Sequence, residues 1–238
     1  MHNTNKLYIL TISKNDQIGL RKTINSVDRI KTNLKLIHII KIFSKDLKKI
    51  DNLKKDNLER IIINNYDSGI YNAMNLIIGK VPINSYCLFL NSGDTIHGVI
   101  NSQNLENFDE CILIKTYKKE YTNKNLIKTK SNFYDGMPFC HQSFIFKKKF
   151  GMKFSEDYKI CGDYDFVIKW FSKTFTSPLK IKTLNNLHTI FDINGISSKK
   201  RFERDIEGYL VIFRNYGIFK SILYLINRIK KYLEIIIY

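Results

Sequence analysis

Apolar and polar positions in the first part of the chain predict strands that alternate with helices. Apolar runs at Leu7–Thr11, Leu36–Phe43 and Arg60–Ile63 are typical of buried strands. A stripe with helical spacing begins near Gln17, and the segment 46–58, rich in Lys and Asp, favours a solvated helix. This alternation predicts an α/β fold with a parallel, doubly wound sheet.

The next apolar run, Tyr86–Leu90, stops abruptly at the sequence Asn-Ser-Gly-Asp in positions 91–94. Open α/β sheets bind ligands at the carboxyl edge of their strands, so a carboxylate directly after a buried strand indicates a ligand site. Asp94 is therefore the first candidate for a metal or phosphate site. The alternative is a simple turn, because each of these residue types favours loops. A capped helix predicted within 67–79 leads into this strand and favours the functional interpretation.

After Asp94 the alternation of predicted strands and helices becomes less regular. Strands are predicted at Cys111–Tyr117 and Gln142–Phe146, separated by a polar stretch, 118–132, that we expect to be a loop. An apolar stripe over Asp163–Phe171 predicts a helix.

The last forty residues are predicted to be helical. A first helix ends at Gly217, and the segment 218–238 has aliphatic residues on one stripe with Lys220, Arg228 and Lys231 opposite. The stripe consists of Ile222, Ile226, Ile229, Leu233 and Ile236. Such a helix suits the interface of an anionic bilayer. The alternative is that the stripe packs on the rest of the chain or on a second subunit, which would make an oligomer.

Composition narrows the choice of partners. The 238 residues include 39 Lys and Arg against 22 Asp and Glu, a formal net charge of +17. This excess favours phosphates, nucleic acid or an anionic membrane, although a general bias toward Lys, Asn and Ile would also produce it. The four cysteines form no CxxC pair, which argues against a zinc site or a disulfide scaffold. The polar amino terminus lacks the apolar core of a signal peptide, so we expect a cytoplasmic protein at the inner face of the membrane.

Five short motifs, taken with their order and spacing, resemble the family 2 glycosyltransferases of the GT-A fold, particularly bacterial members that build surface polysaccharides. They are residues 11–16, 67–75, 89–94, 141–142 and 162–165. The resemblance implies an α/β GT-A fold, Rossmann-like, with a mixed and mostly parallel sheet flanked by helices. We expect this domain to occupy residues 1–198 and an amphipathic helical tail to occupy 199–238.

The resemblance implies inverting transfer of a sugar from a nucleotide-diphosphate sugar, with UDP as the expected nucleotide, to a glycan or a lipid-linked acceptor. Asp163 matches the base of the family, and a helix amino end also favours negative charge there. The alternative for this acid is helix capping. Asp94 would hold Mg²⁺ or Mn²⁺, since a hard divalent cation needs only one or two carboxylates beside phosphate oxygens.

Further roles carried over from the family concern binding. The nucleotide would contact Thr11, Ser13, Lys14, Asp67 and Asn75. The donor-sugar or acceptor pocket would include Asn91, Gly93, His141, Gln142 and Asp165. The stretch 191–197 resembles the closing loop of the family, where a metal or phosphate contact could arise.

The chain also departs from the family. An Asp-Gly pair usually ends the second strand and binds the nucleoside, but here the segment 40–46 offers only Asp46. An inactive relative acting as a partner subunit is therefore one alternative. A nucleic-acid-binding protein is another, suggested by the charge with 14 Tyr and 16 Phe. The aromatic residues mostly belong to apolar stripes and no nucleic-acid motif is present, so we expect no nucleic-acid partner.

Overall fold

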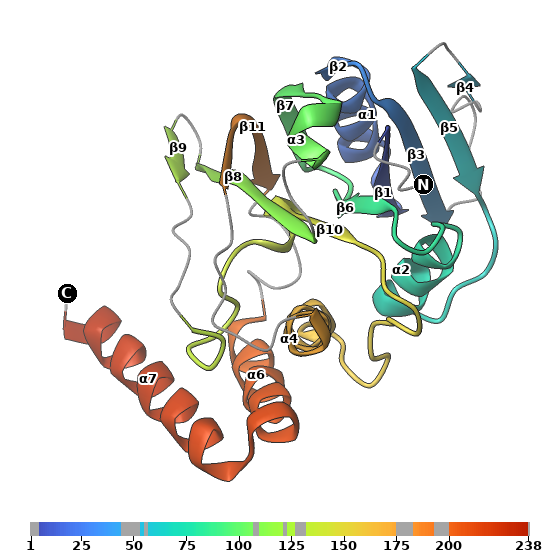
Figure 1. The fold of residues 1–238 in the computed structure, drawn as a ribbon. Coiled ribbons are helices and arrows are strands. Elements are labelled where there is room, and N and C mark those ends of the chain that lie inside the picture. Colours follow the sequence, from blue (N-terminus) through green and yellow to red (C-terminus); the bar gives the residue numbers. More distant parts are fainter. Residues whose placement is uncertain are drawn as a thin grey trace.

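The computed structural model describes residues 5–43, 53–54, 57–106, 110–120, 123–126, 132–174, 183–192 and 200–237. It has a mixed α/β fold in which helices flank a curved sheet and two further helices follow at the carboxyl end (Figure 1). The strands are β1 (Lys6–Lys14), β2 (Lys31–Thr32), β3 (Lys35–Phe43), β4 (Leu53–Lys54), β5 (Leu58–Ile63), β6 (Tyr86–Phe89), β7 (Thr95–Ile100), β8 (Cys111–Glu120), β9 (Asn123–Leu126), β10 (Phe144–Lys147) and β11 (Thr183–Asp192). The helices are α1 (Gln17–Val27), α2 (Ile70–Gly79), α3 (Ser102–Glu106), α4 (Gly162–Thr174), α6 (Arg201–Tyr216) and α7 (Ile218–Ile237), with a 3-10 turn, η1, at His141–Ser143.

The sheet has the strand order β2-β7-β11-β8-β10-β6-β1-β3-β5-β4, and β9 pairs with β8. Strands β6, β1, β3 and β5 run parallel, which confirms the α/β pattern predicted for the first part of the chain. Strand β10 lies antiparallel between β6 and β8, so the sheet is mixed beyond this point. The carboxyl ends of the parallel strands meet at one edge, which is where ligands of such sheets bind.

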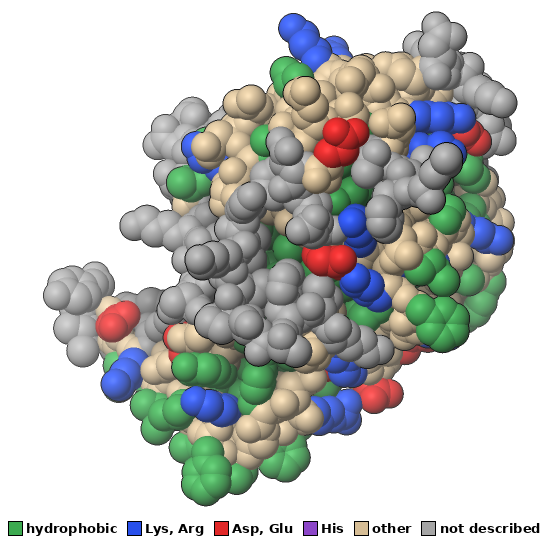
Figure 2. Space-filling view, viewed as in Figure 1, with side chains coloured by type: hydrophobic (Ala, Val, Ile, Leu, Met, Phe, Trp, Pro, Cys, Tyr) green, Lys and Arg blue, Asp and Glu red, His purple; other side chains and the backbone are tan. Residues whose placement is uncertain are grey.

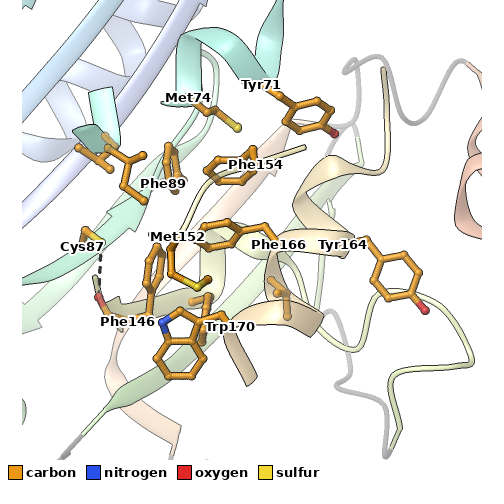
Figure 3. Packing of buried hydrophobic residues seen from close by; sticks show 14 of the residues in the cluster. Tyr71, Met74, Cys87, Phe89, Phe146, Met152, Phe154, Tyr164, Phe166 and Trp170 are labelled. Carbon is orange, nitrogen blue, oxygen red and sulfur yellow. Dashed lines mark hydrogen bonds between the residues drawn. The ribbon is translucent and has the colours of Figure 1, made fainter. Parts of the chain in front are cut away.

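Alternation of side chains along each strand divides the core between the two faces of the sheet. On β1, Leu7 and Ile9 pack on the α1 side, whereas Tyr8 and Leu10 join the cluster beneath α2 and α4. Aromatic rings dominate the second cluster (Figure 3): Phe154 stacks on Phe166 with ring centroids 4.1 Å apart. Helix α4 is thus fixed by close-packed rings, and its amino end is held at a defined place relative to the sheet.

Two local expectations are corrected. The segment 46–58 was expected to be a helix, but Leu53–Lys54 is a strand that pairs antiparallel with β5, and Leu58 already belongs to β5. The rest of that helix, residues 46–52 and 55–56, lies outside the described residues. The expected loop 118–132 begins as a hairpin of β8 and β9. In both cases the polar segment forms backbone hydrogen bonds with a neighbouring strand, β4 with β5 and β9 with β8, and the local pattern of charges does not reveal such pairing.

The carboxyl-terminal helices begin and end much as predicted, with Gly217 between them. Helix α6 lies beside α4 (Figure 1), and its Val211 and Ile212 are fully buried in the same cluster as the rings of α4. Among the described residues, no helix is both long and apolar enough to cross a bilayer. The four cysteines are free thiols.

His38 on β3 is fully buried and makes the stability of the fold sensitive to acid. Its Nε2 lies 2.9 Å from the hydroxyl of Thr11, which donates its own hydrogen to the carbonyl of Leu90. Its Nδ1 has no hydrogen-bond partner among the described residues. Burial, with the charge of Arg60 as a second cause, lowers the pKa of His38 to about 3. The folded protein therefore holds this imidazole neutral at pH values well above 3.

We expect the free energy of unfolding to fall as the pH drops below about 6.5, the pKa of an unfolded histidine. The unfolded chain then binds a proton that the folded chain cannot bind, at a cost of about 2 kcal/mol by pH 5. Urea unfolding of the wild type and of His38→Gln at pH 7.5 and pH 5 measures this. The variant should lose about 2 kcal/mol less between the two pH values. Equal losses in both proteins would contradict the assignment.

Candidate functional site

The loop that carries Asp94 is anchored by α1. The hydroxyl of Thr23 donates to the carbonyl of Asp94 at 2.7 Å and accepts from the backbone N–H of Gly93 at 3.1 Å. The hydroxyl of Ser92 donates to the carboxylate of Asp16, the residue that caps α1. Gly93 has φ +94°, a conformation that other residues adopt only with strain. These contacts fix the direction in which the Asp94 carboxylate leaves the strand edge.

The Asp94 carboxylate is buried and receives two hydrogen bonds. Gln142 Nε2 donates to Oδ2 at 2.8 Å, and the backbone N–H of Asp192 donates to Oδ1 at 2.9 Å. Burial raises the pKa of Asp94 to about 6, and the nearby Asp192 carboxylate also raises it, while the two hydrogen bonds act in the opposite direction. A cation that approaches this carboxylate would favour its ionised form and lower its pKa.

Asp163 lies in the first turn of α4, where its Oδ1 accepts from the backbone N–H of Tyr164. Its Oδ2 lies 3.1 Å from His141 Nδ1, and both side chains are partly exposed. On the other side of the ring, His141 Nε2 lies 3.2 Å from Asn91 Nδ2. With Nδ1 as the donor to Asp163, Nε2 can accept from the Asn91 amide.

One 3-10 turn therefore links the two candidate carboxylates. His141 contacts Asp163, and its neighbour Gln142 holds Asp94. Gln142 and Asp94 are both buried, and the Gln142 amide holds the Asp94 carboxylate by a hydrogen bond. The contacts bring together Asn91, Gly93, Asp94, His141, Gln142 and Asp163.

A second group of predicted residues lies at the ends of β1 and β3. The Lys14 Nζ stands 4.8 Å from the centroid of the Phe43 ring, and the ring of Tyr66 packs edge-on against the same Phe43. Beneath them the buried Lys41 pairs with Asp67 at 2.8 Å and donates to the carbonyl of Asn65. Asp67 is thus neutralised by a lysine that stands in the segment 40–46, where the family usually has its nucleoside-binding acid.

The other predicted binding residues have structural partners. Thr11 is fully buried between Leu90 and His38, and Ser13 is buried with its hydroxyl 3.4 Å from the carbonyl of Asp16. Asn75 holds the Phe154 backbone through both its oxygen and its nitrogen.

Asp165 is turned away from Asp163, as expected from their spacing on a helix. It accepts from Asn215 of α6 at 2.9 Å and pairs with Lys169 at 2.7 Å. The structure does not bring Asn75 or Asp165 to the group around Asp94.

Three residues near the site were not singled out by the sequence. Asp192 lies against Gly93 and donates its backbone N–H to Asp94. Its only signal was its place at the start of the stretch that resembles a closing loop. Tyr71 of α2 packs so closely on Gly162 that a Cβ there would lie 2.7 Å from its ring. Glu207 of α6 accepts from three consecutive backbone N–H groups, those of residues 159–161, directly before α4.

The donor set around Asp94 fits a hard divalent cation. Asp94 and Asp192 supply carboxylate oxygens at the carboxyl edge of the sheet, and the two hydrogen bonds to Asp94 leave further lone pairs on its oxygens. No group of three or more His, Cys, Asp or Glu suited to a metal occurs among the described residues. Mg²⁺ commonly binds through one or two carboxylates and completes its shell with substrate phosphates and water. The residues present therefore fit a cation that arrives with a diphosphate.

An open pocket of about 390 Å³ lies elsewhere, at the opposite edge of the sheet near the amino ends of β1 and β3. Its lining is formed by Asn5, Asn33, Leu34, Lys35, Asn57 and Ser102. It contains no carboxylate and no histidine, so we place the candidate site at the carboxyl edge, where the titratable groups converge.

Comparison with known families and with curated proteins gives no match to this chain. Comparison with solved structures shows that the fold is similar to that of S. aureus TarS. A crystal structure of TarS residues 1–349 has a TM-score of 0.54 at 14% identity, covering 90% of this chain and 68% of that one. The structure of the same TarS fragment in complex with UDP has a TM-score of 0.55 at 14% identity, with the same coverage. The chain thus shares the mixed α/β fold of the TarS fragment, with helices on both sides of the sheet.

Proposed function

We propose that this protein is an inverting, metal-dependent glycosyltransferase that moves a sugar from a UDP-sugar to a glycan or lipid-linked acceptor in surface polysaccharide synthesis. One observation carries the proposal: Asp94 and Asp163, which reside on different elements, are linked through the adjacent side chains of Gln142 and His141. Glycosyl transfer needs one group beside the departing diphosphate and another beside the incoming hydroxyl. The similarity of the fold to TarS, which was crystallised with UDP, supports the choice of substrate class.

In the proposed reaction Asp163 accepts the proton of the acceptor hydroxyl as its oxygen attacks the anomeric carbon. The bond between that carbon and the diphosphate oxygen breaks, and UDP leaves from the opposite face of the sugar. His141 holds the Asp163 carboxylate in place, since its ring is itself held by Asn91. A Mg²⁺ or Mn²⁺ ion bound at Asp94 and Asp192 would offset the charge that develops on the diphosphate.

The nucleotide is proposed to lie over the ends of β1 and β3. Lys14 can reach a phosphate or ribose, and the exposed ring of Tyr66 beside Phe43 offers a surface on which a base could stack. The pairing of Asp67 with Lys41 leaves the nucleoside contacts to these residues and to backbone groups. An acceptor carried by a lipid would place the protein at the inner face of the cytoplasmic membrane.

A panel of UDP, GDP, dTDP and CMP with and without Mn²⁺, read by thermal shift, tests this function. We expect UDP with Mn²⁺ to give the largest increase in melting temperature, because a ligand at about 100 times its Kd adds about 2.7 kcal/mol of stability. Release of UDP from UDP-sugars by the purified protein then separates an enzyme from an inactive partner subunit. If no nucleoside diphosphate stabilises the protein while arbitrary oligonucleotides bind in a salt-sensitive way, the proposal is wrong.

A further inference from the structure

Helix α7 directs its polar side toward the protein and its aliphatic stripe toward the solvent. Its polar side faces the protein: Ser221 is fully buried, and Arg228 lies over the ring of Tyr224 and 3.5 Å from Asp205 of α6. Its aliphatic stripe faces outward, and its four members with described side chains are 42–57% exposed. These are Ile222, Ile226, Ile229 and Leu233. Among the described residues, the predicted alternative in which this stripe packs on the rest of the chain is therefore not what the structure shows.

Helix α6 repeats the same arrangement. It turns Val211 and Ile212 toward the core, and Gly208 lets the hydroxyl of Tyr224 approach so closely that a Cβ would collide with it. Its outward row of apolar residues is exposed like that of α7 and consists of Phe202, Ile206, Leu210 and Phe213. Figure 2 shows hydrophobic side chains gathering at the end of the molecule formed by α6 and α7, with Lys and Arg among them. We call these two rows the outer face of the helical hairpin.

We propose that the outer face of the hairpin lies in the interfacial region of an anionic lipid bilayer. Leaving this many aliphatic and aromatic side chains in water is unfavourable, and soluble monomers rarely expose a patch of this kind without a partner. An interfacial helix combines an apolar face with basic residues. Segment 218–237 contains four Lys and Arg against one Glu, and of these Lys230 is exposed beside the stripe, whereas Arg228 is directed toward Asp205.

Charge decides between lipid and a second copy of the chain. Two molecules that each carry a formal charge of +17 repel one another when these faces meet, whereas an anionic surface attracts both the exposed Lys230 beside the stripe and the molecule as a whole. The occupant that the composition favours is therefore a membrane of negatively charged phospholipids.

The hairpin is also coupled to the candidate base. Glu207 of α6 accepts hydrogen bonds from the backbone directly before α4, and Asn215 of α6 donates to Asp165, two residues after Asp163. A hairpin seated on a bilayer would hold the amino end of α4 at a fixed height above the lipid. This consequence for a lipid-linked acceptor rests on the proposed function, whereas the lipid binding itself does not.

Vesicle sedimentation of the full chain tests the inference. We expect the wild type to sediment with vesicles of phosphatidylglycerol and phosphatidylcholine, to bind vesicles of phosphatidylcholine alone much more weakly, and to be released by salt. The double variant Ile222→Glu, Ile226→Glu should bind the anionic vesicles at least about tenfold more weakly, because it places two charges in the apolar face. The control is Ile18→Glu on α1, which removes an even more exposed isoleucine far from the hairpin in the chain and should bind like the wild type.

Circular dichroism and the UDP thermal shift on the same preparations show whether each variant is folded and keep this result separate from the proposed function. Unchanged vesicle binding by the double variant would overturn the inference. It would also be overturned if the wild type formed a dimer without lipid that the double variant dissociates, as measured by light scattering after size-exclusion chromatography, because the second copy would then be the occupant.

Discussion

Replacement of Asp163 by asparagine is expected to lower kcat for sugar transfer by about 10²- to 10⁴-fold, the range typical of a lost general base. Asparagine has the same shape, so its Oδ1 can still accept from the Tyr164 N–H and the first turn of α4 should persist. What disappears is the basic oxygen that faces His141 and could accept a proton. Transfer assays with a defined acceptor measure kcat, and titration with UDP shows separately whether the variant still binds the nucleotide.

Two further variants serve as controls that show whether the loss of kcat is particular to Asp163. Asp165→Asn removes a neighbouring buried carboxylate that contacts Asn215 and Lys169, so it should lower stability and leave kcat near that of the wild type. Asp157→Asn changes an acid on the surface and should change neither. If Asp163→Asn transfers sugar at the full rate, Asp163 is only a helix-capping residue, which is the alternative that the sequence left open.

Much of the parallel half of the fold could be predicted because each of its strands is a short apolar run that is visible in the local sequence. Buried runs such as β1 and β6 carry apolar residues on both faces, and the polar break after β6 marks the sheet edge where Asp94 lies. The strands that the sequence did not predict are less apolar than β1 and β6. Strand β7 directly follows the loop of Asp94, and it is defined by pairing with β11, a segment nearly ninety residues later in the chain. Local periodicity contains no information about such a partner.

The same limit applies to the candidate site residues. Asp94 and Asp163 sit at the ends of elements whose type is visible in the sequence, so their positions could be inferred. The use of a side chain depends on tertiary contacts: Asn75 matches a family motif, yet it binds the Phe154 backbone. For α7, the sequence predicts an aliphatic stripe but not the direction that it faces. That direction is set by Asp205 and Gly208 of α6, which receive Arg228 and Tyr224.

Replacement of Asp94 by asparagine is expected to remove most of the metal-dependent transfer activity, by at least about 10²-fold, since a neutral amide oxygen is a poor ligand for Mg²⁺ or Mn²⁺. The folded state should not suffer. Burial raises the pKa of Asp94 to about 6, so at neutral pH the ionised carboxylate is held at a cost in stability that a neutral amide avoids. The Asn oxygen can keep the bond from the Asp192 N–H, whereas its amide nitrogen replaces the oxygen that accepts from Gln142, so the Gln142 amide has to turn and present its oxygen instead.

The variant should therefore melt at the same temperature as the wild type or higher, while UDP with Mn²⁺ stabilises it no more than UDP alone. Loss of activity together with a lower melting temperature would instead indicate that Asp94 only holds the loop 91–94. Asp192→Asn provides the comparison, because its backbone N–H still binds Asp94 and only its carboxylate changes. A smaller loss in the Mn²⁺-dependent shift is expected there if both carboxylates contact the ion, and full Mn²⁺-stimulated transfer by Asp94→Asn would exclude a metal site at this edge of the sheet.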